Sequence, residues 1–141
     1  MNQTAESQLD QKICIEILQE SEQNFKKTHS FEERFIEYQI IRCNYPGFIP
    51  IACELENITD VDVSKHINFR FYVSDDIFVG HLKNYLKELF QKRIKTMKKS
   101  HRLHLLIEDD VIIKHDIPIK EVYTKKVEPD GWLYLKLSID Y

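Results

Sequence analysis

The stretch over residues 30–54 limits the fold most, because it changes from a helical to a strand-like pattern across two prolines. Its first residue can cap a helix, and Glu33, three residues later, completes the pattern of a capping box. Apolar residues then recur at helical spacing until Pro46 ends the helix and opens a turn. Over residues 48–55 apolar side chains alternate as in a strand, although Pro50 has no N–H for a neighbouring strand. We therefore expect a helix beside a strand that tolerates a proline.

The remainder of the chain predicts three more strands and two more helices. We expect strands at 68–73, 103–107 and 132–139, a helix over about 78–99 capped by Asp76, and a short helix after Pro118. A polar loop joins the first two strands, which predicts an antiparallel hairpin. This order of elements is that of an α+β protein. It matches the ubiquitin-like β-grasp fold, with a mixed four-stranded sheet and extra N-terminal helices.

Residues 1–28 precede this domain and are polar at first, then weakly amphipathic. Ile13, Ile17 and Leu18 share one face if the segment is helical. We predict a partly helical extension over 1–28 and a single ubiquitin-like domain over 29–141. A frayed tail is the alternative for the extension.

The cysteines and the apolar runs limit where the chain works. Cys14, Cys43 and Cys53 are an odd number of widely spaced thiols in a chain without a signal-peptide pattern. This favours a reducing compartment over a disulfide framework. No apolar run approaches the length needed to cross a bilayer. We therefore expect a cytosolic or nuclear protein.

No motif in the chain predicts catalysis, a cofactor or a metal site. Asp109 and Asp110 are adjacent, so their side chains point apart on a strand or turn. His101 and His104 have no cysteine or acidic partner at zinc-ligand spacing. There is no glycine-rich phosphate loop, and no cysteine has the local signature of a nucleophile. We expect a binding protein rather than an enzyme.

A run of cations over residues 92–102 is the strongest charge feature. It consists of Lys92, Arg93, Lys95, Lys98, Lys99 and Arg102, with no acid among them. Such a run can contact the phosphates of membrane headgroups or of nucleic acid. A solvated helix end explains it equally well, because cations favour that end of the helix dipole. No aromatic residues are interleaved, which disfavours nucleic acid.

Motifs at both ends of the chain resemble those of one family, in the same order. Phe31, Glu32 and Arg34 lead to Tyr45, Pro46, Pro50 and Glu54, which matches Phe-Glu-x-Arg followed by Tyr-Pro-x-x-x-Pro-x-x-x-Glu. Further on come YVSDDIFVG, KRI, EDDVI and DGWLYL, the last similar to an Asp-Gly-Phe-Leu-Tyr strand. Residues 29–141 thus resemble the autophagy ubiquitin-like modifiers, the family of the GABA-A receptor-associated protein and the microtubule-associated protein light chains. That family has a β-grasp core with two extra N-terminal helices.

The resemblance implies binding of aromatic-x-x-aliphatic peptides from autophagy receptors and machinery. The peptide adds a strand to the exposed edge of the hairpin's second strand, and its two anchors enter two apolar pockets. Matched residue by residue, the aromatic pocket is Ile41, Pro50, Ala52, Arg70, Tyr72 and Trp132. The aliphatic pocket is Phe71, Val73, Ile77, Leu82 and Leu86, with Lys92 and Arg93 as flanking basic contacts.

In this interpretation Pro50 leans out of the sheet to wall a pocket, and Arg70 pairs with acids beside the peptide motif. Structural alternatives stay open for several of these residues. Trp132 can simply pack between sheet and helices, and Arg70 can protect an edge strand from aggregation. Leu82 and Leu86 suit a core as well as a pocket floor.

The ending departs from the family pattern. Family members are cut by a cysteine protease to expose a terminal glycine, which is then joined to phosphatidylethanolamine. This chain ends in LYLKLSIDY, and Gly131 lies inside the last turn. We expect no lipid conjugation; the alternative is a conventional lipid-conjugated modifier whose C-terminus is truncated. The resemblance also implies contact with the processing protease and activating enzymes, and a location on autophagosomal or vesicle membranes besides the cytoplasm.

Overall fold

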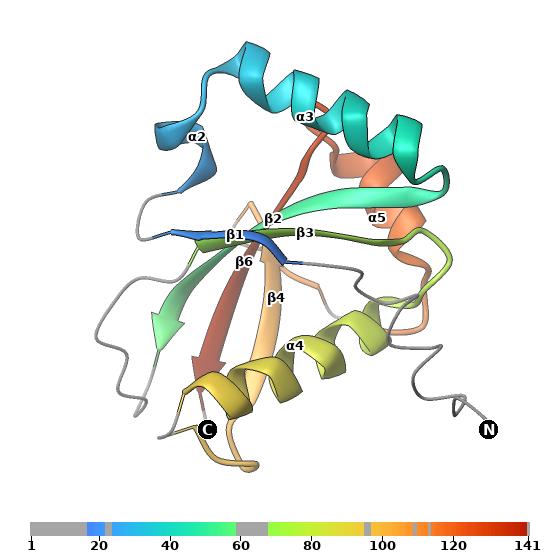
Figure 1. Cartoon of the computed structure of the whole chain (residues 1–141). Coiled ribbons are helices and arrows are strands. Elements are labelled where there is room, and N and C mark those ends of the chain that lie inside the picture. The colour runs from blue at the N-terminus through green and yellow to red at the C-terminus, as the bar shows by residue number, and fades with distance from the viewer. Residues whose placement is uncertain are drawn as a thin grey trace, which may run out of the picture.

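The structure is a computed structural model that describes residues 17–21, 24–58, 68–94, 97–108, 110–112 and 114–140. They form one sheet with helices on both of its faces (Figure 1). The strands are β1 (Ile17–Ser21), β2 (Phe48–Ile58), β3 (Asn68–Ser74), β4 (Arg102–Ile107), β5 (Asp110–Val111) and β6 (Leu133–Asp140). The helices are α2 (Phe25–Thr28), α3 (Phe31–Asn44), α4 (Val79–Arg93) and α5 (Ile119–Lys126).

The sheet has the order β1-β3-β2-β6-β4-β5. β2 pairs antiparallel with β3 and parallel with β6, so the sheet is mixed as predicted. The four predicted strands are the central ones, β3, β2, β6 and β4. β1 is added beside β3 and β5 beside β4, so the sheet has six strands where the sequence predicted four.

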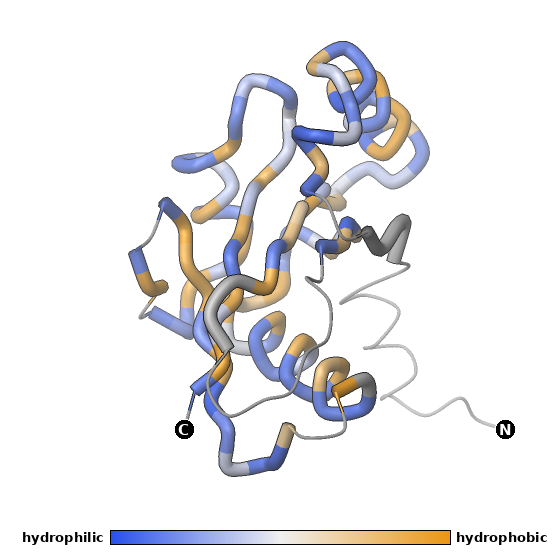
Figure 2. Tube along the Cα trace, turned by 90° about the vertical axis from the view of Figure 1, so that its left-hand side faces the viewer, coloured by the Kyte–Doolittle hydropathy of each residue, from blue (hydrophilic) through white to orange (hydrophobic). Residues whose placement is uncertain are grey.

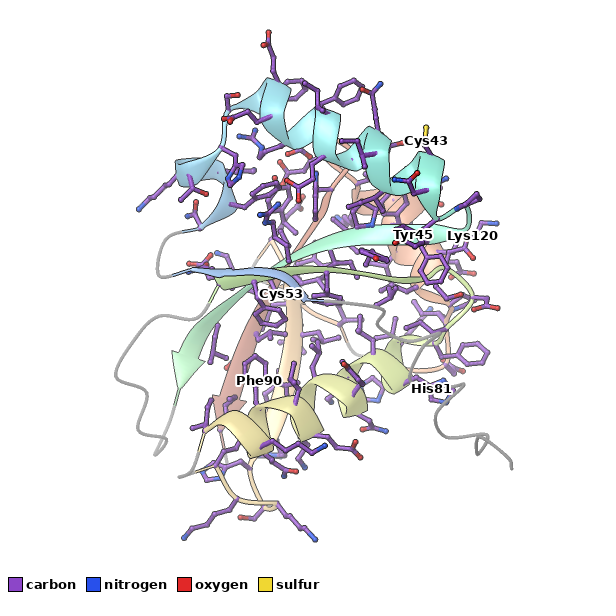
Figure 3. All side chains as sticks on the ribbon, viewed as in Figure 1. Cys43, Tyr45, Cys53, His81, Phe90 and Lys120 are labelled. Carbon is purple, nitrogen blue, oxygen red and sulfur yellow. The ribbon has the colours of Figure 1, made fainter. Side chains whose placement is uncertain are left out.

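Side chains pack on both faces of the sheet. α4 covers one face, and α2 and α3 lie over the other (Figure 1). Figure 2 shows apolar residues recurring along the turns of α4, and Figure 3 shows Phe90 of this helix pointing toward the sheet. The main core lies between α4 and the sheet, and a smaller cluster lies between α3 and the sheet. Two apolar layers therefore share β2 and β3 between them.

The helix α3 begins and ends where the sequence predicts. The Ser30 Oγ accepts from the Glu33 N–H at 3.2 Å, and the Ser30 N–H donates to the Glu33 Oε1 at 2.8 Å. This reciprocal pair is the predicted capping box. Tyr45 is the C-cap, directly before Pro46. Local chemistry alone therefore sets both ends of this helix.

The helix α4 differs from the prediction at both ends. It covers Val79–Arg93 instead of 78–99, and its N-cap is Phe78 instead of Asp76. Asp76 accepts instead from the Ser74 hydroxyl. The first helical N–H groups, of Val79 and Gly80, donate to the carbonyls of Ile117 and His115. A distant segment thus takes the place of a side-chain cap.

Pro50 lies within β2, opposite Tyr72 of β3, and is buried. The prediction that it leans out of the sheet is therefore wrong. The Asp75 N–H donates to the Gly47 carbonyl, which makes the odd-numbered residues of β2 the ones that bond β3. The nitrogen of Pro50 consequently faces the β6 side, where pairing begins only at Ile51. No neighbouring strand loses a ladder bond to this proline.

The N-terminal extension contains a strand where a helix was predicted. Ile17 and Leu18 belong to β1, so the helical face proposed for them is wrong; Ile13 lies outside the described residues. Among the residues described, helix in the extension is limited to α2, which Asn24 caps. The physical reason is that β3 otherwise offers an open row of backbone groups, and an extended segment can satisfy them.

Candidate peptide-binding site

A cluster of buried side chains fills the space between α3 and the sheet. We call it the aromatic cluster and define it as Phe25, Ile41, Pro50, Ala52, Arg70, Tyr72 and Trp132. Its members come from α2, α3, β2, β3 and the turn before β6. In β2 and β3 they are even-numbered residues, which share one face of the sheet. The structure therefore brings all six residues of the predicted aromatic pocket together and adds Phe25.

Phe25 is the member of the aromatic cluster that no sequence motif singled out. Its ring meets the Trp132 ring edge to face, with 4.8 Å between centroids, and it is buried. The Arg70 guanidinium lies over the same ring, 4.2 Å from its centroid. The sequence feature that could have indicated Phe25 is its position as an aromatic residue shortly before Ser30, the residue that caps α3. Phe25 occupies the space in which an aromatic anchor was expected.

Trp132 is a packing residue in this structure. Its side chain is fully buried, and its Nε1–H donates to the Arg34 carbonyl of α3 at 2.8 Å. The ring therefore fastens the start of β6 to the helix that covers the sheet. It can wall a binding site only from behind, since no part of it is exposed.

Arg70 is buried to 7% exposure, and α3 compensates its charge. Its guanidinium donates to the Glu37 carboxylate of α3 in an ion pair. Together with the Phe25 ring, this carboxylate holds Arg70 against the sheet. An acidic peptide that pairs with Arg70 must therefore share the guanidinium with Glu37 or replace Glu37.

Tyr72 closes the other end of the aromatic cluster. It is 2% exposed and stacks on Tyr45, with 4.7 Å between ring centroids. Figure 3 shows Tyr45 where α3 gives way to β2. Phe48 meets Tyr72 edge to face at 6.0 Å. These rings form a partly exposed aromatic rim beyond the residues that the sequence predicted.

The residues of the predicted aliphatic pocket lie on the opposite face of the sheet. They are Phe71, Val73, Ile77, Leu82 and Leu86, each at most 7% exposed and part of the core beneath α4. We call this set the aliphatic cluster. Phe71 and Val73 are the odd-numbered neighbours of Arg70 and Tyr72 in β3. This strand therefore separates the two predicted pockets.

The edge of β3 is paired in this structure. β1 lies antiparallel to it, with Gln19 opposite Arg70 and Ser21 opposite Asn68. The sequence predicted that a peptide would find this edge exposed. Instead, β1 is the outermost strand, and β3 has strands on both sides.

The predicted flanking cations lie at the C-terminal end of α4. Lys92 is exposed there, and Arg93 is the last residue of the helix. The exposed Lys98 and Lys99 follow in the next turn. Arg102 pairs with Asp140 at 3.5 Å, with most of its side chain exposed. All of them lie at one end of the helix that covers the aliphatic cluster.

A hollow of about 260 Å³ opens beside the aromatic cluster, and no sequence motif indicated it. Its apolar lining includes Phe25, Ala52 and Leu135. Charged pairs stand at its border, with Lys26 bound to Glu128 at 2.6 Å and Lys126 to Glu108 at 3.5 Å. The hollow therefore continues the face of the sheet that α2 and α3 leave open.

A buried ionic network anchors α3 to the turn before β6. The Asp130 carboxylate, 2% exposed, accepts from the Arg34 Nε at 2.9 Å and from the Trp132 N–H at 3.0 Å. The Tyr134 hydroxyl donates to it at 2.5 Å. Hydrogen bonding to Asp130 raises the pKa of Arg34 even though burial opposes the charge. This network fixes the helix that forms the roof of the aromatic cluster.

The model of the family described as autophagy protein Atg8, ubiquitin-like, matches residues 33–140. The chain belongs to the Atg8 family. It is 30% identical over 115 residues to autophagy-related protein 8 of Mycosarcoma maydis, covering 81% of this chain and 90% of that protein. Autophagy-related protein 8 of Schizosaccharomyces pombe is 29% identical over 114 residues, covering 81% of this chain and 88% of that protein.

Solved structures of Atg8 proteins share the fold of this family member. Trypanosoma brucei ATG8 superimposes with a TM-score of 0.69 at 25% identity, covering 84% of this chain and 95% of that one. Plasmodium falciparum Atg8, solved in complex with a Plasmodium falciparum Atg3 peptide, gives 0.64 at 23% identity, covering 82% and 95%. The ubiquitin-like β-grasp prediction is confirmed.

Three further observations concern metal binding, membrane spanning and the histidines of this Atg8-family chain. Among the described residues, no three His, Cys, Asp or Glu side chains gather into a group that could hold a metal ion. None of the described helices is long and apolar enough to span a bilayer. The two histidines considered from the sequence have structural contacts: the His101 Nδ1 accepts from the Lys98 N–H, and the His104 Nε2 meets Asp140 at 3.2 Å.

The buried tyrosines predict loss of stability in alkali. Burial, with a further contribution from Asp130, raises the pKa of Tyr134 above its ordinary value of 10, and burial likewise raises that of Tyr123. Below about pH 10 both states keep these protons; above it the unfolded chain loses them first. We expect the free energy of unfolding, measured in urea, to fall steadily above about pH 10. Tyr134→Phe should flatten this decline, and an unchanged slope would contradict the assignment.

Proposed function

We propose that this Atg8-family chain binds short aromatic-x-x-aliphatic peptides along β3. One observation carries the proposal: the aromatic cluster and the aliphatic cluster lie on opposite faces of the sheet, separated by the single strand β3. In an extended peptide, residues three apart point to opposite faces. A peptide strand beside β3 would therefore direct its aromatic residue toward one cluster and its aliphatic residue toward the other.

Backbone pairing and side-chain anchors would make different contributions to peptide binding. Ladder hydrogen bonds to β3 supply affinity that depends little on sequence, and the two clusters select the anchors. Because the members of both clusters are buried, the anchors would enter only after neighbouring side chains move. The Plasmodium falciparum Atg8 complex with an Atg3 peptide supports peptide binding for a protein of the same fold.

The cellular role we propose is that of a non-enzymatic adaptor in autophagosome formation or cargo selection. Its partners would be peptide motifs of autophagy receptors and machinery, together with the modifier-processing protease and activating enzymes. It would act in the cytoplasm and on autophagosomal or vesicle membranes. We assign the modifier domain to residues 29–141 and the extension to residues 1–28. The family assignment supports the autophagy role.

Trp132 makes a direct binding test possible, because it is the only tryptophan in the chain. The probe is a short acidic peptide carrying Phe-x-x-Leu, which lacks tryptophan and leaves Trp132 as the sole indole. We expect a saturable change in Trp132 emission with a dissociation constant in the micromolar range, about −8 kcal/mol. A peptide with both anchors replaced by alanine is the control. No saturation of either the emission signal or a calorimetric titration up to about 1 mM, both in the wild type and in a Gln19→Pro variant that weakens the pairing of β1 with β3, would reject the proposed function.

Arg70 should determine the preference for acidic peptides. We expect Arg70→Gln to weaken binding of the acidic Phe-x-x-Leu peptide by about tenfold, in line with a charge-assisted contact of about 1.5 kcal/mol. Lys120→Gln is the matched control, since Lys120 is exposed on α5 and belongs to neither cluster. Calorimetry on both variants measures the difference. Equal affinities would show that Arg70 only balances Glu37.

A further inference from the structure

We propose that β1 and Phe25 together act as an internal ligand that occupies the peptide site in cis, so that a peptide must displace them to bind. This inference rests on the proposed function, because it names what controls access to the same site. Two independent contacts carry it, one made by the backbone of β1 and the other by the ring of Phe25.

The backbone of β1 uses the hydrogen-bonding groups that a peptide strand would need. Odd-numbered residues of β3 bond β2, as the register from the Asp75–Gly47 bond shows. The even-numbered residues therefore point their N–H and C=O groups to the other side, toward β1. Gln19 lies opposite Arg70 and Ser21 opposite Asn68. These are the ladder positions at which an added strand would pair.

Phe25 supplies an aromatic ring to the same site. Only residues 22–24 separate the end of β1 from Phe25. The ring lies against Trp132 and beneath the Arg70 guanidinium, inside the aromatic cluster. One short stretch of chain thus adds a strand to β3 and places an aromatic side chain in the aromatic cluster. These are the two contacts that the proposed peptide would make.

The pairing between β1 and β3 is short enough for a peptide strand to replace β1. β1 has five residues, pairs with β3 alone among the described strands, and has an irregular register between Ile17 and Gln19. Covalent attachment nevertheless keeps it at a high effective concentration beside its site. The apparent association constant for a peptide equals the intrinsic association constant multiplied by the fraction of molecules in which β1 is detached. Weakening β1 should therefore strengthen peptide binding.

Two proline variants of the full-length chain test this, because neighbouring residues of β1 direct their N–H groups to opposite sides. The Gln19 N–H faces β3, so Gln19→Pro removes a ladder donor. The Glu20 N–H faces away, so Glu20→Pro is the matched control on the same strand. Gln19→Ala, which keeps the N–H, controls for the loss of the side chain. All four proteins are titrated with the acidic Phe-x-x-Leu peptide, and their melting temperatures are compared.

We expect Gln19→Pro to bind the peptide about tenfold more tightly than the wild type or more, as required if β1 is detached in a tenth of the molecules or fewer. Glu20→Pro and Gln19→Ala should bind like the wild type. Equal affinity in all four proteins, or weaker binding by Gln19→Pro, would overturn the internal ligand and leave the proposed function standing. No binding by any of them, Gln19→Pro included, would overturn the proposed function itself.

Hydrogen exchange and light scattering test whether β1 is supplied in cis. In the monomeric wild type we expect the Arg70 amide to exchange slowly, and in Gln19→Pro to exchange faster until peptide is added. Fast exchange in the wild type would overturn the pairing. A wild-type dimer that Gln19→Pro converts to a monomer would overturn occupancy in cis, because β1 would then be exchanged between two copies.

Discussion

Asp130→Asn is expected to lower the free energy of unfolding by about 3–5 kcal/mol. The substitution keeps the shape of the side chain but removes its charge, which leaves the largely buried Arg34 guanidinium without its counter-ion. The Trp132 N–H and the Tyr134 hydroxyl, which both donate to this carboxylate, would also lose a charged acceptor. Urea unfolding followed by Trp132 emission measures the change.

Glu128→Gln is the control for this experiment, two residues earlier in the same turn. Glu128 pairs with Lys26, and both side chains are more than a third exposed. The cost of losing an exposed pair of this kind is at most about 1 kcal/mol. Similar losses for Asp130→Asn and Glu128→Gln would mean that the Arg34–Asp130 pair is not the anchor of α3 described above.

Gly131→Ala is expected to destabilise the chain by about 2–5 kcal/mol. Gly131 has a φ of +87°, a conformation that alanine adopts only with strain. A Cβ at this position would also lie 2.3 Å from the Cγ of the Tyr38 ring, deep inside contact distance. The Tyr123 hydroxyl donates to the Gly131 carbonyl at 2.8 Å, so the turn cannot move freely away from the clash.

Gly47→Ala separates backbone strain from the clash with Tyr38. Gly47 has nearly the same φ, +83°, but a Cβ there would meet nothing within 4 Å. Its substitution should cost about 1 kcal/mol, the strain alone. In the double variant Gly131→Ala with Tyr38→Ala, the total loss should be smaller than the sum of the two single losses. Equal losses for the two glycine variants, or full additivity, would contradict the steric explanation.

Several features of this chain follow from neighbours in the sequence, which is why the sequence predicted them. The capping box of Ser30 and Glu33 lies within one turn, and Pro46 stops the helix by its own covalent structure. Alternation in β2, β3 and β6 records which face each side chain takes. The same alternation separated Arg70 and Tyr72 from Phe71 and Val73 on the two sides of their strand, and the family motifs supplied the assignment of residues to the two pockets.

The missed features depend on contacts between distant segments. The start of α4 is set by the carbonyls of His115 and Ile117, more than thirty residues away, so Asp76 is not needed as a cap. Phe25 is packed in the aromatic cluster only because the fold brings Arg70 and Trp132 beside it. The sequence around Phe25 and around the start of α4 does not indicate these distant partners.

The sequence by itself determined α3, the presence of α4 and α5, the four central strands and their β-grasp order, since hydrophobic periodicity and turn chemistry act over a few residues. The family resemblance supplied the predicted pocket residues. Only the tertiary structure decided the fate of Ile17–Ser21. A weak amphipathic pattern permits a helix there, but the open side of β3 offers this segment backbone partners from Asn68 to Phe71. That pairing joins residues some fifty positions apart. The pairing of β1 with β3 also determines whether a peptide can reach the proposed site along β3.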